Sequence, residues 1–169
     1  MLPALMENLN NMNLRIGYGV DVHRLESSSK LIIGGLSIDS EFGAVGHSDA
    51  DVLLHAICDA LLGAANMRDI GYHFSDKDSK YKGIDSKELL TEVVRLIETK
   101  NYSVVNIDCT VVLEIPKLNV HIPEMSRIIS RILKVDQDVV SIKATTHEQV
   151  DSFGASEAIK AYAACLICS

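Results

Sequence analysis

The sequence of 169 residues lacks any apolar run that approaches the length of a membrane span, and it has no cluster of Lys or Arg. These absences argue against a transmembrane protein and against binding of a nucleic-acid backbone, which needs a concentrated basic face. With 16 basic and 23 acidic side chains, the net charge is −7. Small phosphorylated ligands are still compatible with this charge, because metal ions and backbone amides also neutralise phosphate.

The first thirteen residues have neither a basic start nor a long apolar stretch. We therefore expect no secretory signal and no Arg- and Ser-rich transit peptide among them. The length suits one domain, and no repeat or low-complexity linker divides the chain. We expect residues 1–13 to be a disordered N-terminal extension and residues 14–169 to form a single domain.

The sequence has four cysteines but lacks the second pair that would complete a four-cysteine zinc site. Cys165 and Cys168 have the spacing of a redox or zinc motif, yet they close the chain instead of following a first strand. We expect Cys58, Cys109 and this pair to be small buried apolar groups rather than disulfides.

Hydrophobic periodicity predicts strands that alternate with helices, in an α/β or α+β arrangement whose helices cover one sheet face. Residues 43–47 and the polar segment 67–85 are expected to be loops, and the apolar segment 158–167 fits either a helix or a strand. The expected strands are 14–22, 31–33, 36–38, 104–113 and 139–144, and the expected helices are 49–65, 86–100 and 124–133.

Asp21 and His23 end the first expected strand, and His55 lies in the first expected helix. Residues two apart on a strand point to the same face, so the carboxylate and imidazole converge. If the helix packs across the strand end, the three side chains leave a fourth metal position open, as in catalytic zinc sites. Spacing alone leaves the alternative open that Asp21 caps a turn and that the two histidines are unrelated.

The segment His47-Ser48-Asp49-Ala50-Asp51 places polar groups at the start of the His55 helix. A helix N-terminus presents free backbone amides that favour phosphate, although caps are common without any ligand. Ser48 is the expected cap. Asp51, His55 and Asp59 follow at intervals of four residues, so Asp59 is a candidate for orienting the His55 ring.

Six segments occur in one order and resemble the 2-C-methyl-D-erythritol 2,4-cyclodiphosphate synthase family of the non-mevalonate isoprenoid pathway. The resemblance extends from Arg15 to the C-terminus. The segments are IGYGVDVHRL at 16–25, IIGG at 32–35, GHSDADVLLH at 46–55, DALLGA at 59–64, DIG at 69–71 and KATTHE at 143–148.

The resemblance implies a phosphorus–oxygen lyase that converts 4-diphosphocytidyl-2-C-methyl-D-erythritol 2-phosphate into the 2,4-cyclodiphosphate and CMP. The substrate's own 2-phosphate is the nucleophile, so the protein's task is positioning and charge stabilisation. By resemblance, Asp21, His23 and His55 hold Zn²⁺ or another divalent cation, and Glu148 holds Mg²⁺ or Mn²⁺ that bridges the diphosphate.

The resemblance also assigns His47 and Thr146 as catalytic residues that stabilise the transition state. The implied substrate contacts are Asp21, His23, His47, Ser48, Asp69, Gly71, Phe74, Asp76, Asp78, Pro116, Lys117, Thr145 and Thr146.

Members of the family imply an α+β fold with a mixed β-sheet, about three helices on one face, and a homotrimer whose sheets face the threefold axis. Active sites then lie between subunits, and the C-terminal segment is a strand. The expected location is the bacterial cytoplasm, with the plastid stroma as the alternative.

The sequence departs from the family pattern at Ala155, which stands where many members have an Arg that contacts phosphate. We therefore do not extend to this protein the binding of a downstream isoprenoid diphosphate on the threefold axis, which is suggested for some members.

Two other functions compete with cyclisation on the sequence alone. A zinc-dependent phosphohydrolase or nucleotidase would use the metal to activate water, but the chain lacks HExxH and a dense second metal cluster. A non-catalytic, metal-stabilised trimeric binding module would not need the open metal position that the three ligands leave.

Overall fold

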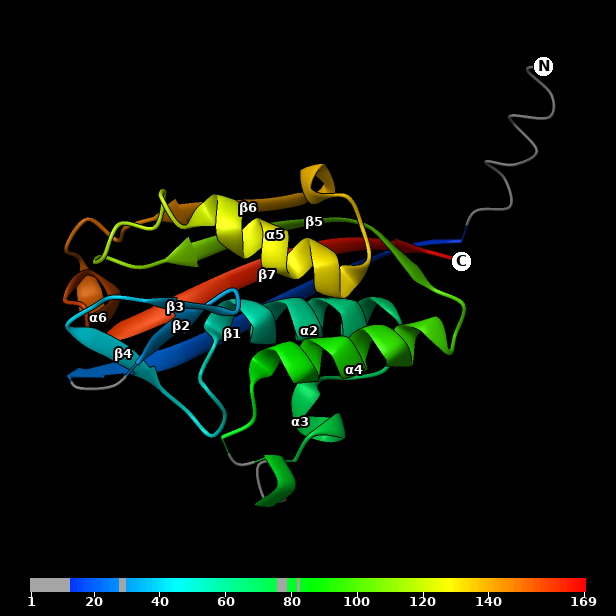
Figure 1. Ribbon diagram of the computed structural model, residues 1–169, viewed down its shortest axis with the longest axis horizontal. Coiled ribbons are helices and arrows are strands. Elements are labelled where there is room, and N and C mark those ends of the chain that lie inside the picture. Colours follow the sequence, from blue (N-terminus) through cyan, green and yellow to red (C-terminus); the bar gives the residue numbers. More distant parts are fainter. Residues whose placement is uncertain (1–12, 28–29, 76–78, 82) are drawn as a thin grey trace.

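The computed structural model describes residues 13–27, 30–75, 79–81 and 83–169. Its centre is a mixed five-stranded sheet in the order β4-β1-β7-β5-β6, in which β5 and β6 run parallel and the other neighbours run antiparallel (Figure 1). A separate hairpin joins β2 (Leu31–Ile33) to β3 (Leu36–Ile38). The sheet strands are β1 (Leu14–Ser27), β4 (Phe42–Val45), β5 (Ser103–Val112), β6 (Val140–Thr145) and β7 (Ala158–Cys168).

The C-terminal segment, whose sequence fits helix or strand, is the strand β7. It pairs with β1 from Leu14 opposite Cys168 to Arg24 opposite Ala158. Its residues alternate between buried and half-buried along the whole strand. This alternation shows that one face of the sheet lies against helices while the other is more open.

Three long helices cover one face of the sheet, as the sequence predicts (Figure 1). Helix α2 (Val52–Ala64) lies against β1 and β7, α5 (Ile122–Leu133) lies against β6, and α4 (Ser86–Glu98) packs on α2 and α5. Two short α-helices were not expected, because one turn leaves no periodic pattern: α3 (Ile70–His73) and α6 (Asp151–Gly154). The described chain also has the 3₁₀ turns η1 (Ser79–Tyr81) and η2 (Gln137–Val139).

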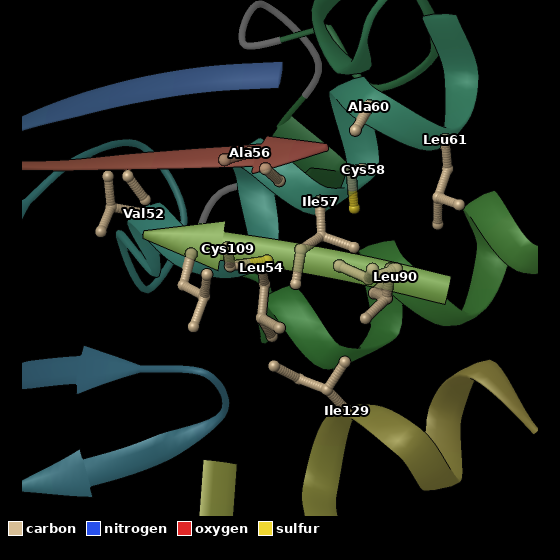
Figure 2. Close-up of a cluster of buried hydrophobic side chains, with 14 of the residues drawn as sticks. Val52, Leu54, Ala56, Ile57, Cys58, Ala60, Leu61, Leu90, Cys109 and Ile129 are labelled. Atoms are coloured by element: carbon tan, nitrogen blue, oxygen red, sulfur yellow. The ribbon is translucent and has the colours of Figure 1, made fainter. Parts of the chain in front are cut away.

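The core is a cluster in which these layers meet. Figure 2 shows Leu54 and Ile57 of α2 together with Leu90 of α4, Ile129 of α5 and Cys109 of β5, which lies next to Leu54. All five side chains are at most 1% exposed. Burying large aliphatic groups of this kind contributes about 1.5–3 kcal/mol each relative to exposure, so the cluster fixes how α2 sits on the sheet.

Strand β1 approaches α2 so closely that only glycine fits between them. A Cβ on Gly17 would lie 1.9 Å from the carbonyl oxygen of Ala60, and one on Gly19 would lie 2.0 Å from that of Ala56. Both glycines are buried and alternate with exposed residues, so they form the helix-facing side of the strand. The next residue on that side is Asp21, which this contact brings to the start of α2.

Some boundaries differ from those expected. Residues 43–47 were expected to be a loop, but Phe42–Val45 pairs with β1 as the edge strand β4. The helix expected at 49–65 begins later, because Ala50 has a left-handed backbone (φ 58°) and Asp51 provides the cap. No helix in the described part of the chain combines the length and apolar character that a bilayer span requires.

Candidate active site

Asp21, His23 and His55 meet at one point beside the N-terminal half of α2. Asp21 Oδ2 lies 2.9 Å from His23 Nε2 and 3.0 Å from His55 Nδ1, and the two ring nitrogens are 3.2 Å apart. Ligands of a tetrahedral zinc ion with bonds of about 2.0–2.1 Å stand roughly 3.3 Å from one another. The three donor atoms therefore have nearly the mutual spacing that a divalent cation needs, and they form a metal-binding group among the described residues.

Charge pairing shifts the pKa values of Asp21 and His55 in opposite directions. Burial would raise the pKa of Asp21, but hydrogen bonds to His23 and His55 outweigh it and hold the pKa well below its usual range. Burial would lower the pKa of His55, but the hydrogen bond and charge of Asp21 outweigh it and raise the pKa. The carboxylate thus stays ionised and faces two imidazoles, which is the donor set of a cation site.

Asp51 is the residue that caps α2, and it is fully buried. Its carboxylate accepts hydrogen bonds from the backbone N–H groups of Leu53 and Leu54, at 3.1 Å each, and from Gly34 and Gly35, at 2.9 and 2.6 Å. Burial raises its pKa to about 6, against the lowering effect of these amide bonds. Asp51 therefore ties the β2–β3 hairpin to the helix that carries His55.

The capping role expected of Ser48 and the orienting role considered for Asp59 are wrong. Ser48 does not cap α2; its hydroxyl accepts from Ala50 N at 3.2 Å and lies 3.0 Å from His55 Nε2. Asp59 does not orient His55; its carboxylate accepts from Ile70 N at 2.8 Å and holds α3. The other partner of His55 Nε2 is the hydroxyl of Ser86, at 2.9 Å.

A cavity of about 370 Å³ opens next to the metal-binding group. His47 and Ser48 line it from the loop before α2, and Gly71 and Phe74 line it from α3 and its exit. The remaining lining residues are Asp21, His23, His55, Ile70, Tyr81, Ile84 and Leu89. It therefore combines polar groups on one side with apolar groups on the other, as small-molecule sites do.

Asp69 caps α3 and accepts from Tyr72 N at 2.8 Å, so it stands beside Gly71 at the edge of this cavity. The ring of Phe74 meets that of Tyr81 edge to face, with centroids 5.5 Å apart. The predicted contacts Asp76 and Asp78 lie outside the described residues.

Of the remaining predicted residues, Lys117, Thr145 and Thr146 line a second cavity, of about 310 Å³, at the ends of β5 and β6. Thr146 donates a hydrogen bond to Glu148 Oε1 at 2.6 Å, and Thr145 lies beside it. Pro116, which follows a cis peptide bond, precedes Lys117 in the segment after β5. The cavity is lined by Leu113, Lys117, Leu118, Asn119, Ala144, Thr145 and Thr146. One chain therefore brings the predicted residues together as two groups in separate cavities.

A sequence model of the YgbB family matches residues 14–168. The chain belongs to the YgbB family.

Sequence relatives of this YgbB-family chain are named as synthases of a cyclic diphosphate. The chain is 54% identical over 156 residues to 2-C-methyl-D-erythritol 2,4-cyclodiphosphate synthase of Bacteroides fragilis, and the match covers 92% of this chain and 98% of that protein. A solved 2C-methyl-D-erythritol-2,4-cyclodiphosphate synthase with bound CDP matches with a TM-score of 0.84 and 37% identity, over 90% of this chain and 99% of that one. The bifunctional IspDF of Campylobacter jejuni matches with a TM-score of 0.90 and 32% identity, over 94% of this chain but only 43% of the longer one.

Several site residues of this YgbB-family chain escape sequence reasoning. Tyr81, Ile84 and Leu89 line the first cavity, but they look like ordinary loop and core residues in the sequence. Glu114 accepts a hydrogen bond from His147 N at 3.2 Å and so joins the ends of β5 and β6.

Proposed function

We propose that the protein converts 4-diphosphocytidyl-2-C-methyl-D-erythritol 2-phosphate into 2-C-methyl-D-erythritol 2,4-cyclodiphosphate and CMP, as a metal-dependent phosphorus–oxygen lyase. Membership of the YgbB family and the names of its relatives place the chain in non-mevalonate isoprenoid biosynthesis. The bacterial source of those relatives supports a cytoplasmic location.

The observation that carries this function is the donor triangle of Asp21, His23 and His55 beside a cavity lined by His47 and Ser48. A divalent cation held there, zinc on the basis of its nitrogen and oxygen donors, would polarise a phosphate oxygen. The imidazole of His47 and the hydroxyl of Ser48 would contact phosphate oxygens as hydrogen-bond donors. Intramolecular attack then depends on how firmly the two phosphates are aligned, and it needs no nucleophile from the protein.

The second cavity would take the cytidine part of the substrate. The solved relative with bound CDP shows that a cytidine diphosphate binds a protein of this fold. Lys117 and Thr145 line the cavity here. Thr146 and Glu148 share a hydrogen bond at its edge, where Glu148 would hold Mg²⁺ or Mn²⁺ on the diphosphate and Thr146 would donate to it.

A homotrimer would join the two cavities across a subunit interface. One substrate that contacts both groups of residues needs them in one site, although they lie in separate cavities of the single chain. The open face of the sheet supports such an assembly, because Ile16 is 78% exposed and Tyr18 64%. With Leu14, Val20 and Val22, these side chains form an apolar stripe along β1, of the kind that protein interfaces cover.

The test is to incubate the purified protein with the cytidylyl substrate, Zn²⁺ and Mg²⁺, and to follow the products by phosphorus NMR. A cyclic diphosphate and CMP support the proposal. Linear phosphate products would instead indicate a phosphohydrolase, and no turnover would indicate a binding module.

His55→Ala tests the metal site separately. It should remove bound zinc, measured by atomic absorption, and abolish cyclisation while the protein stays folded. His121→Ala is the matched control, because His121 lies at the start of α5, away from the donor triangle, and should keep its zinc. Unchanged zinc content in His55→Ala would refute the ligand assignment.

A further inference from the structure

The two nitrogens of the His55 ring face different kinds of partner. Nδ1 points at the donor triangle, 3.0 Å from Asp21 Oδ2, whereas Nε2 lies 2.9 Å from the Ser86 hydroxyl and 3.0 Å from the Ser48 hydroxyl. A ring nitrogen binds a cation through its lone pair, so a metal on Nδ1 requires the proton on Nε2. That single N–H has two hydroxyl groups within reach.

The two hydroxyls differ in what else they contact. Ser86 is buried, its hydroxyl donates to Asp49 Oδ1, and its backbone N–H donates to Asp49 Oδ2 at 3.1 Å. The hydroxyl hydrogen of Ser86 is thus committed to a carboxylate, which leaves an oxygen lone pair for His55. Ser48 lines the cavity, where its hydroxyl can turn to a ligand. Ser86 is therefore the fixed acceptor and Ser48 the adjustable one.

We propose that Asp49 and Ser86 are positioning residues that hold the His55 ring with its proton on Nε2 and its Nδ1 lone pair toward the cation. This inference rests on the metal site of the proposed function. Hydrogen bonds run in one direction, from His55 Nε2–H to the Ser86 hydroxyl and from that hydroxyl to the Asp49 carboxylate. A carboxylate at the end of such a chain makes the imidazole a stronger metal ligand and fixes its orientation.

The same contacts make the metal ligand depend on the packing of a second helix. Ser86 is the first residue of α4, and Asp49 precedes α2. The two segments are also joined by backbone hydrogen bonds from Asp49 N to Ile84 O at 3.2 Å and from Gly83 N to His47 O at 2.9 Å. Packing of the α4 N-terminus against the loop before α2 therefore fixes both the orientation of the His55 ring and the position of the His47 backbone.

The experiment measures the zinc dissociation constant of the full chain by competition with a chromogenic chelator. Removal of an outer hydrogen-bond partner typically weakens metal binding about 10–100-fold, and we expect a loss in this range for Ser86→Ala. Asp49→Asn keeps an oxygen for the backbone N–H of residue 86, but its amide group cannot accept the hydroxyl hydrogen. The Ser86 hydroxyl would then turn its hydrogen toward Nε2 and favour the wrong tautomer, so zinc binding should weaken by a similar factor.

Ser130→Ala is the matched control, since Ser130 is also a buried helical serine but donates only to the backbone oxygen of Arg127 in the described structure. Its zinc affinity should equal that of the wild type. If Asp49 and Ser86 act through one chain of hydrogen bonds, the variant that carries both substitutions should lose no more zinc affinity than the single variant with the larger loss. Additive losses, or wild-type affinity in either single variant, would overturn the inference.

Two further measurements separate the explanations. Urea unfolding of the metal-free variants identifies a purely structural role, which would lower stability and leave zinc affinity unchanged, and so would overturn the inference. Wild-type protein that binds zinc no more tightly than His55→Ala would instead refute the metal site of the proposed function. Tight wild-type binding with unchanged affinity in Asp49→Asn would refute only the positioning role.

Discussion

The contact between β1 and α2 can be tested by adding one methyl group, in Gly19→Ala. The new Cβ would lie 2.0 Å from the carbonyl oxygen of Ala56. Carbon and oxygen atoms approach comfortably to about 3.3 Å, so the strand and the helix must separate by roughly 1.3 Å. Because the obstacle is helix backbone and cannot rotate away, we expect the free energy of unfolding to fall by about 3 kcal/mol, the upper end for overpacking.

The same displacement should damage the site, because Ala56 directly follows His55 and Gly19 lies two residues before Asp21. Functional groups need to stay within about 0.5 Å of their productive geometry, and an error of about 1 Å can cost about 100-fold in rate. We therefore expect cyclisation to slow about 100-fold and zinc to bind more weakly. Urea unfolding, chelator competition and phosphorus NMR measure these three effects.

Gly63→Ala is the control on the same helix, because an added Cβ there meets nothing within 4 Å. It should raise stability by up to about 1 kcal/mol through lower chain entropy in the unfolded state. A Gly19→Ala protein with the wild-type urea midpoint and zinc affinity would refute the claim that this close contact sets the metal site.

Three other changes test separate parts of the structure. Asp51→Ala should lower the free energy of unfolding by at least about 3 kcal/mol in urea, because four backbone N–H groups lose their acceptor. Ile16→Asp should leave the subunit folded but monomeric by light scattering, since a charge on the exposed stripe would be buried in the assembly. In the metal-free protein, the lowered pKa of Asp21 adds stability above about pH 3.9, and this stability is lost as the pH falls. The raised pKa of His55 adds stability below about pH 6.5, and this stability is lost as the pH rises. The contribution of this pair should therefore be greatest between these values, and it is measured as the difference between the urea midpoints of the wild type and Asp21→Asn across the pH range.

Most of the fold could be predicted from residue patterns because its long elements are strongly periodic. The alternation along β1 and the apolar face of α4 give the observed first residue of both elements, but β1 runs to Ser27, beyond its expected end at residue 22. The mixed sheet, which the family resemblance implies, is confirmed. Local pattern failed at β4, whose four residues include a Gly and an Ala, and which is a strand only because β1 extends far enough to pair with it. The left-handed backbone of Ala50, which delays the start of α2, also has no marker in the sequence.

The grouping of Asp21, His23 and His55 was predictable in part. Asp21 and His23 lie on the same face of one strand, and His55 lies on the same side of its helix as Asp51 and Asp59. Their meeting depends on Gly17 and Gly19, whose role is visible only once the helix backbone is known to touch them. A strand pattern with small residues on one side indicates close packing in general, but it does not identify the partner. The separation of the predicted residues into two cavities likewise follows from the chain's path and not from any local motif.

The wrong partner assigned to His55 shows which physical rule was missing. Asp59 lies on the same stripe as His55, and the spacing of four residues made it the natural candidate. Side chains on an α-helix tilt toward its N-terminus, however, so the His55 ring extends away from Asp59 and toward the start of α2. The groups that meet it there are the hydroxyls of Ser48 and Ser86, one from the preceding loop and one from the first residue of α4. Partners of a helical metal ligand should thus be sought one turn before it and on whichever element packs there, which here is a helix that begins 31 residues later.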